Sequence, residues 1–155
     1  MATTTKQSKI LIADDETAIT TGLSAILSDD GYDVEVVGDG QKALDRLTTD
    51  PFGVVLADLK MPKLDGLGLL RELQKREIPT ECIIVTGQAT VDSAVQAMRE
   101  GAYDFVEKPL KRMTIVKSVR KAAERGRLLE ENRSLKDEIK ALTKREIVEI
   151  GRAHV

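Results

Sequence analysis

Short apolar runs alternate along this chain with segments whose apolar residues recur every three or four positions, and this alternation constrains the fold most. The runs predict β-strands at residues 9–13, 33–37, 53–57, 82–85 and 104–107. Helical spacing follows each run, at positions that include Leu23, Leu44, Leu70 and Val95, and a long helical pattern begins near Arg112. Glycines or prolines separate most of these segments, as expected at the ends of helices and strands.

Strands that alternate with helices predict an α/β fold with a parallel sheet and right-handed crossovers. The predicted strands at 9–13, 53–57 and 82–85 are almost continuously apolar, which is typical of a sheet covered by helices on both faces. In doubly wound sheets of this kind, ligands bind beyond the carboxyl ends of the strands, where the strand order reverses. Any functional residues are therefore expected at the strands' carboxyl ends.

Composition excludes several other classes of protein. Hydrophobic residues make up 41% of the 155 positions, enough for a core, and the net charge of −2 argues against an electrostatic nucleic-acid surface. No apolar run approaches the roughly 18 residues of a membrane span, and the first residues lack the apolar core of a signal peptide. Cys82 is the single cysteine, so an internal disulfide framework is excluded. We expect a cytoplasmic protein with no membrane partner.

Polar and charged residues follow four of the predicted strands. Asp14 and Asp15 follow the first strand, Asp58 the third, Thr86 ends the fourth, and Lys108 follows the fifth. Taken singly, each could be a helix cap, a turn residue or a surface charge. Taken together, three close carboxylates would repel one another by roughly 4 kcal/mol per pair at an effective dielectric of about 20. The grouping therefore favours a bound cation.

The chemistry of this set points to phosphoryl transfer. Hard oxygen ligands in an incomplete cage suit Mg²⁺, which keeps waters and takes phosphate oxygens as partners. Asp58 is central, and a carboxylate can act as a nucleophile toward phosphorus. Asp14 and Asp15 would hold the metal, while Lys108 would pair with Asp58 before the transfer and with the phosphoryl group after it. Thr86 would donate a hydrogen bond to a phosphoryl oxygen.

Four motifs, ILIADDE, VVLADLKMPKLDGL, CIIVTGQA and GAYDFVEKPL, carry a family resemblance. From about Lys9 to Arg125 the chain resembles the receiver domain of bacterial two-component response regulators. The resemblance implies a flavodoxin-like fold with strand order 2-1-3-4-5, and a sensor histidine kinase as the partner that phosphorylates Asp58. It also implies that the chain is a regulatory phosphoacceptor rather than an enzyme.

The resemblance also assigns roles to individual residues. It implies that Mg²⁺ is held by Asp14, Asp15, Asp58 and the backbone carbonyl of Lys60. Thr86 would be the switch hydroxyl and Phe105 the switch aromatic residue. The Lys108–Pro109 peptide bond would be cis, a form that is uncommon in other proteins.

The segment DLKMPKLDGLGLL most resembles receiver domains of the nitrogen-regulatory, sigma-54 activator type. Such proteins continue into an ATPase domain that acts on sigma-54 RNA polymerase and then into a DNA-binding domain. The chain has no P-loop signature, so DNA and the polymerase would be reached only through domains outside it. We expect residues 1–8 to be a disordered segment, 9–125 the receiver domain, 126–149 a linker helix, and 150–155 a tail of vector origin.

Beyond Gly126 the helical pattern changes to a heptad repeat. Calling the leucines position d places an asparagine and an isoleucine at position a: Leu128, Asn132, Leu135, Ile139 and Leu142. A buried asparagine at one a position is a known device for fixing a two-stranded register. This pattern predicts a coiled coil and a homodimer, and the alternative is a single exposed helix.

Three other functions compete with the receiver interpretation. A haloacid-dehalogenase-type enzyme also uses an aspartate nucleophile, but it needs a second aspartate two residues on, where this chain has Lys60. A flavin binder needs a glycine- and hydroxyl-rich phosphate loop after the first strand, where this chain has three acidic residues. An inactive receiver that serves only as a dimer module is disfavoured because all five expected site residues are present.

Overall fold

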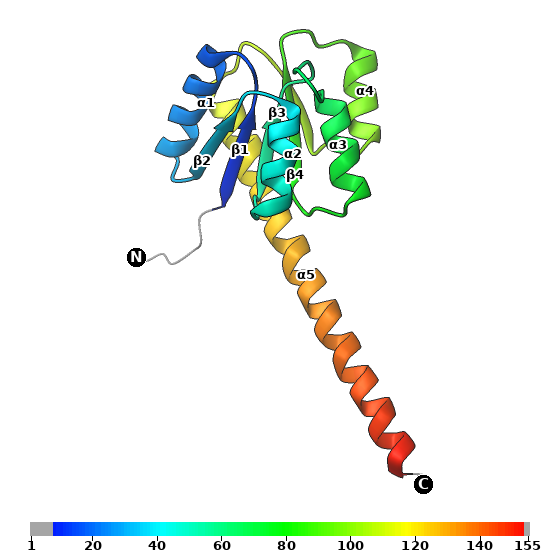
Figure 1. The fold of residues 1–155 in the computed structure, drawn as a ribbon. Helices are drawn as coiled ribbons and strands as arrows, with labels where there is room; N and C mark the ends of the chain where they lie inside the picture. Colours follow the sequence, from blue (N-terminus) through cyan, green and yellow to red (C-terminus); the bar gives the residue numbers. More distant parts are fainter. Residues whose placement is uncertain (1–7, 154–155) are drawn as a thin grey trace.

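The computed structural model describes the backbone of residues 8–153, and the side chains within that range except those of residues 130, 133, 134 and 144–153. Five parallel strands form one sheet in the order β2-β1-β3-β4-β5 (Figure 1). The strands are β1 (Lys9–Ala13), β2 (Asp33–Val37), β3 (Val54–Ala57), β4 (Glu81–Thr86) and β5 (Asp104–Glu107). The helices are α1 (Thr17–Asp29), α2 (Gly40–Thr49), α3 (Gly66–Lys75), α4 (Val91–Arg99) and α5 (Arg112–Ala153). Each predicted element is present, and the flavodoxin-like strand order is confirmed. The expected disordered segment lies, apart from Ser8, outside the described residues, as do residues 154–155 of the expected tail.

Helices cover both faces of the sheet, and alternate strand residues serve each face. On β1, Leu11 packs into the core beneath α2 and α3, while Ile10 and Ile12 pack into the core beneath α1 and α5. All four residues of β3 are buried, as expected for a central strand covered on both sides. The two cores hold the central strands, and hence their carboxyl ends, in fixed positions.

Helix α4 is present as predicted, but most of its apolar side chains are not covered. Ala97 is its one buried residue, whereas Val91, Val95 and Met98 are exposed. The helix contacts β5, the edge strand of the sheet, so less of its surface meets the core. An apolar surface is therefore presented beside β5.

Helix α5 belongs to the domain only over its first third. Ile115, Val119, Ala122 and Ala123 are buried against the sheet, and then the helix projects away from the domain (Figure 1). At the exit, a Cβ on Gly126 would lie 3.3 Å from the carbonyl oxygen of Gly53, so the two backbones are close. No helix in the described part of the chain is long and apolar enough to cross a membrane.

Candidate functional site

The carboxyl ends of the strands bring three predicted site residues into direct contact. Lys108, which follows β5, places its Nζ 2.9 Å from Oδ2 of Asp14 and 3.0 Å from Oδ2 of Asp58. Asp14 and Asp58 are only 4% and 6% exposed, so both carboxylates are largely removed from water. A third carboxylate, that of Glu16, lies 3.1 Å from the same Nζ. One ammonium group therefore contacts three acidic side chains.

Burial and charge act against each other in this cluster. Burial of the Lys108 ammonium disfavours its charge, yet hydrogen bonds to Asp14, Asp58 and Glu16 outweigh burial and raise the pKa of Lys108 above its ordinary value. Burial also raises the pKa of Asp14, and the nearby charge of Asp58 adds to this rise. The backbone N–H of Glu16 and the Lys108 ammonium oppose it. The site therefore holds more negative charge than Lys108 alone offsets.

Backbone contacts fix the two buried aspartates. The N–H of Asp58 donates to the carbonyl oxygen of Ala13 at 3.0 Å, which places Asp58 beside the end of β1. Asp14 accepts a hydrogen bond from the N–H of Glu16 at 2.9 Å, and Asp58 accepts one from the N–H of Lys60 at 3.2 Å. Both carboxylates are thus oriented by the loops that directly follow their own strands.

Thr86 and Phe105 lie on β4 and β5, on the Lys108 side of the sheet. Thr86 is 1% exposed, and its hydroxyl accepts a hydrogen bond from the N–H of Gln88 at 3.2 Å. The N–H of Lys108 donates to the Thr86 carbonyl oxygen at 2.9 Å, so β4 positions the lysine backbone. Phe105 is half-buried against the core beneath α2 and α3 and pairs in register with Ile84. The Lys108–Pro109 bond is cis, as expected.

The residues present fit a divalent cation. Carboxylate oxygens of Asp14, Glu16 and Asp58 all lie within 4.8 Å of one another. These are hard oxygen donors, and the mutual repulsion that helps to raise the pKa of Asp14 is what a cation would relieve. Asp15, by contrast, is exposed and is not part of this group of three.

Glu16 is the one residue of the cluster to which the sequence pattern gave no role. It directly follows the acidic pair at the end of β1, which is the signal that could have identified it. Glutamate at the start of a helix is ordinarily explained by the helix dipole, so the position alone does not distinguish a cap from a site residue. In the structure Glu16 is the N-cap of α1, but its side chain makes no capping hydrogen bond and points to Lys108 instead.

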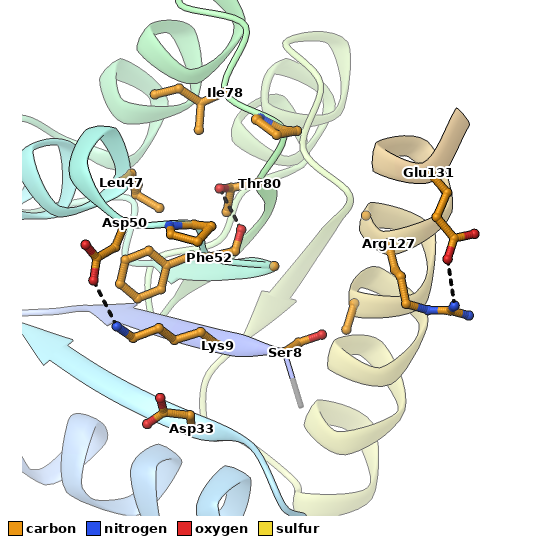
Figure 2. Close-up of a pocket in the computed structure, with 15 residues that line it drawn as sticks. Ser8, Lys9, Asp33, Leu47, Asp50, Phe52, Ile78, Thr80, Arg127 and Glu131 are labelled. Carbon is orange, nitrogen blue, oxygen red and sulfur yellow. Dashed lines mark hydrogen bonds and ion pairs between the residues drawn. The ribbon is translucent and has the colours of Figure 1, made fainter. Parts of the chain in front are cut away.

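A groove of about 850 Å³ lies at the opposite end of the sheet, between the domain and α5 (Figure 2). Four of its five charged side chains form ion pairs: Lys9 with Asp50 at 3.1 Å, and Arg127 with Glu131 at 3.2 Å; the fifth is Asp33. Phe52, which lines it, is largely buried beneath the Lys9 ammonium. These pairings leave the groove without the concentration of uncompensated charge found at the acidic end.

Comparison with known proteins places the chain among signalling regulators. The family described as response regulator receiver domain matches residues 10–120. The chain is 39% identical over 130 residues to the C4-dicarboxylate transport transcriptional regulatory protein DctD of Pseudomonas aeruginosa, covering 84% of this chain and 28% of that protein. It is 37% identical over 141 residues to a putative response regulator, NtrX-like, of Rickettsia bellii, covering 90% and 29%. The chain thus spans less than a third of the length of these relatives.

Solved structures agree with this similarity. The structure of NtrX from Brucella abortus superposes with a TM-score of 0.75 at 33% identity, covering 81% of this chain and 29% of that one. The signal receiver domain of a putative LuxO repressor protein from Vibrio parahaemolyticus superposes with a TM-score of 0.77 at 29% identity, covering 81% and 96%. The match to an isolated receiver domain accounts for nearly all of that second protein.

Proposed function

This chain belongs to the response regulator receiver family, of the type found in sigma-54 activators, and from that premise we propose that Asp58 accepts a phosphoryl group from a sensor histidine kinase in a Mg²⁺-dependent reaction. The observation that carries the proposal is the 3.0 Å contact between Lys108 Nζ and the largely buried carboxylate of Asp58, beside Asp14. A buried carboxylate held by a cation at the switch point of the sheet has the placement that such a phosphoacceptor requires.

The transfer itself needs positioning and charge balance more than covalent chemistry from the protein. A carboxylate oxygen of Asp58 attacks phosphorus, the bond from phosphorus to the donor's imidazole nitrogen breaks, and the imidazole leaves with the bonding electron pair. Asp14 and Asp58, together with the exposed Asp15 and the carbonyl of Lys60, would hold Mg²⁺, and the ion would neutralise charge on the phosphoryl oxygens. Lys108 orients Asp58 beforehand and then pairs with the phosphoryl group.

Phosphorylation of Asp58 would change the surface formed by α4 and β5. Phosphorylation adds about −1.5 to −2 charge at Asp58, and the Thr86 hydroxyl turns from the Gln88 N–H toward a phosphoryl oxygen. Phe105, now half-buried, moves into the space that Thr86 vacates. Because α4 already exposes Val91, Val95 and Met98 beside β5, repacking there alters an apolar surface suited to protein contacts.

Labelling by acetyl phosphate tests the phosphoacceptor directly. We expect wild-type protein to be phosphorylated in the presence of Mg²⁺. No acyl phosphate should form when Mg²⁺ is chelated beforehand or when Asp58 is replaced by alanine. Asp45→Ala is the matched control, because Asp45 lies on the exposed face of α2 and contacts Gln41. Intact labelling of Asp58→Ala, measured by phosphate-affinity gels and mass spectrometry, would refute the assignment of Asp58.

We propose that residues 9–125 form the receiver domain and residues 126–149 a linker helix. This projecting part of α5 would pair with the same helix of a second copy of the chain. Leu128, Leu135, Ile139 and Leu142 are 51–61% exposed, and Asn132 is exposed beside them. Leucines repeating every seven residues on a helix that nothing else in the described chain covers can be buried by a parallel coiled coil. Phosphorylation would then change the geometry of this dimer. The change would act on transcription through further domains, for which the greater length of the relatives is the support.

Replacing Leu135 tests the coiled coil. Leu135→Gln removes from each helix one leucine that the dimer would bury, worth roughly 3 kcal/mol for the pair, so we expect the dimer dissociation constant to rise about a hundredfold. Ala141→Gln, at an exposed position outside the heptad seam, is the control and should leave the constant unchanged. Analytical ultracentrifugation measures both, and equal weakening by the two variants would refute pairing along this seam.

A further inference from the structure

The Lys108 ammonium has three N–H donors, and three carboxylates occupy them. Asp14, Asp58 and Glu16 lie 2.9, 3.0 and 3.1 Å from Nζ, so the described contacts use the full donor capacity of a lysine. No donor is left for an additional acceptor while these three contacts are kept. If Lys108 is to bind a phosphoryl oxygen on Asp58, one of its present partners must leave.

The three partners differ in how readily they can leave. The side chains of Asp14 and Asp58 are 3% and 7% exposed, so either would be left as a buried charge without its cation. The side chain of Glu16 is 59% exposed, so its carboxylate can return to water at little free-energy cost. Glu16 also makes no side-chain capping hydrogen bond to α1, so releasing Lys108 does not disturb the start of that helix.

We propose that Glu16 is a positioning residue that occupies one donor of Lys108 in the resting state and is exchanged for a phosphoryl oxygen when Asp58 is phosphorylated. This rests on the proposed phosphoacceptor function of Asp58. Glu16 therefore destabilises the phosphorylated state, because its carboxylate competes for Lys108 and its charge repels the incoming anion. Removing that charge should favour the phosphorylated form.

Beryllofluoride, a stand-in for the phosphoryl group, provides the measurement. Its dissociation constant is determined at saturating Mg²⁺ for wild type, Glu16→Gln, Glu107→Gln and Asp58→Ala, and the Mg²⁺ dissociation constant is determined separately for each. Glu107 is exposed, adjacent to Lys108 in sequence, and makes none of the contacts seen at the ammonium group, so it reproduces the charge change without the exchange. The ¹⁵N chemical shift of the Lys108 side chain reports on its partners directly.

We expect Glu16→Gln to bind beryllofluoride roughly two- to fivefold more tightly, the range for losing one partly exposed ion pair, while Glu107→Gln binds as wild type does. Without beryllofluoride, the Lys108 ¹⁵N chemical shift should differ between wild type and Glu16→Gln. With beryllofluoride bound, the two proteins should show the same shift. Equal affinities, an equal gain in Glu107→Gln, or weaker Mg²⁺ binding with no gain in beryllofluoride affinity would overturn the exchange. Beryllofluoride binding by Asp58→Ala would instead overturn the proposed function.

Discussion

Replacing Gly40 with alanine is expected to destabilise the protein by at least about 3 kcal/mol, the upper part of the usual range for overpacking, and to lower the melting temperature by about 10 °C. Gly40 begins α2, and a Cβ there would lie 2.6 Å from the carbonyl carbon of Leu64 and closer still to its carbonyl oxygen. These are backbone atoms of the loop between Asp58 and α3, so no side-chain rotation relieves the clash. The helix or the loop has to move.

Gly22→Ala is the matched control for this prediction. Gly22 lies inside α1, and a methyl group added there would meet nothing within 4 Å, so alanine should stabilise the helix by roughly 0.5–1 kcal/mol. Thermal unfolding followed by circular dichroism measures both variants. A Gly40→Ala protein that melts within about 2–3 °C of wild type, a shift of about 1 kcal/mol or less, would contradict the close approach of α2 to this loop.

Replacing Lys108 with methionine is expected to reduce the free energy of unfolding by about 3 kcal/mol in the absence of divalent cations. Methionine keeps most of the side-chain volume but leaves Asp14 and Asp58 buried without their cation, and breaking a buried ion pair costs about 3–5 kcal/mol. The lower end applies because the third partner of Lys108, Glu16, has a side chain that is 59% exposed. Denaturant unfolding in a chelating buffer measures the effect.

Magnesium should restore part of the stability lost in Lys108→Met, because a cation bound only by the folded protein stabilises it by mass action. Lys111→Met is the control, since Lys111 is exposed and has no ion pair among the described contacts. A Lys108→Met protein as stable as Lys111→Met in chelating buffer would show that Lys108 does not balance the buried carboxylates. A loss that Mg²⁺ leaves unchanged would argue against a cation site at Asp14 and Asp58.

The sheet and the main site contacts could be predicted because they depend on chain order. Apolar runs that alternate with helical spacing determine a parallel sheet, and in such a sheet Asp14, Asp58 and Lys108 must meet at one edge even though 94 residues separate Asp14 from Lys108. The contact of Lys108 with Asp58 was therefore predictable from the order of residues alone. So was the start of α5 at Arg112, where the helical pattern follows Pro109.

Exposure and side-chain direction were harder to predict. The apolar spacing of α4 gives a helix correctly but does not reveal that Val91 and Met98 are exposed, because this depends on α4 lying against an edge strand. The contact of Glu16 with Lys108 depends on a rotamer and on the absence of a capping bond, which spacing does not determine. The local sequence pattern therefore predicted the helices and strands. Which of their side chains are buried depends on how these elements pack together.

Helix α5 leaves the domain at the amino ends of the strands, while Asp14, Asp58 and Lys108 lie beyond the carboxyl ends. A large protein can thus approach the acidic end along a path that the projecting helix never enters. Immobilising the chain through that helix would present the acidic end outward, toward solution. If a bulky donor docks at the acidic end, as proposed, attachment at the helix would leave its path free.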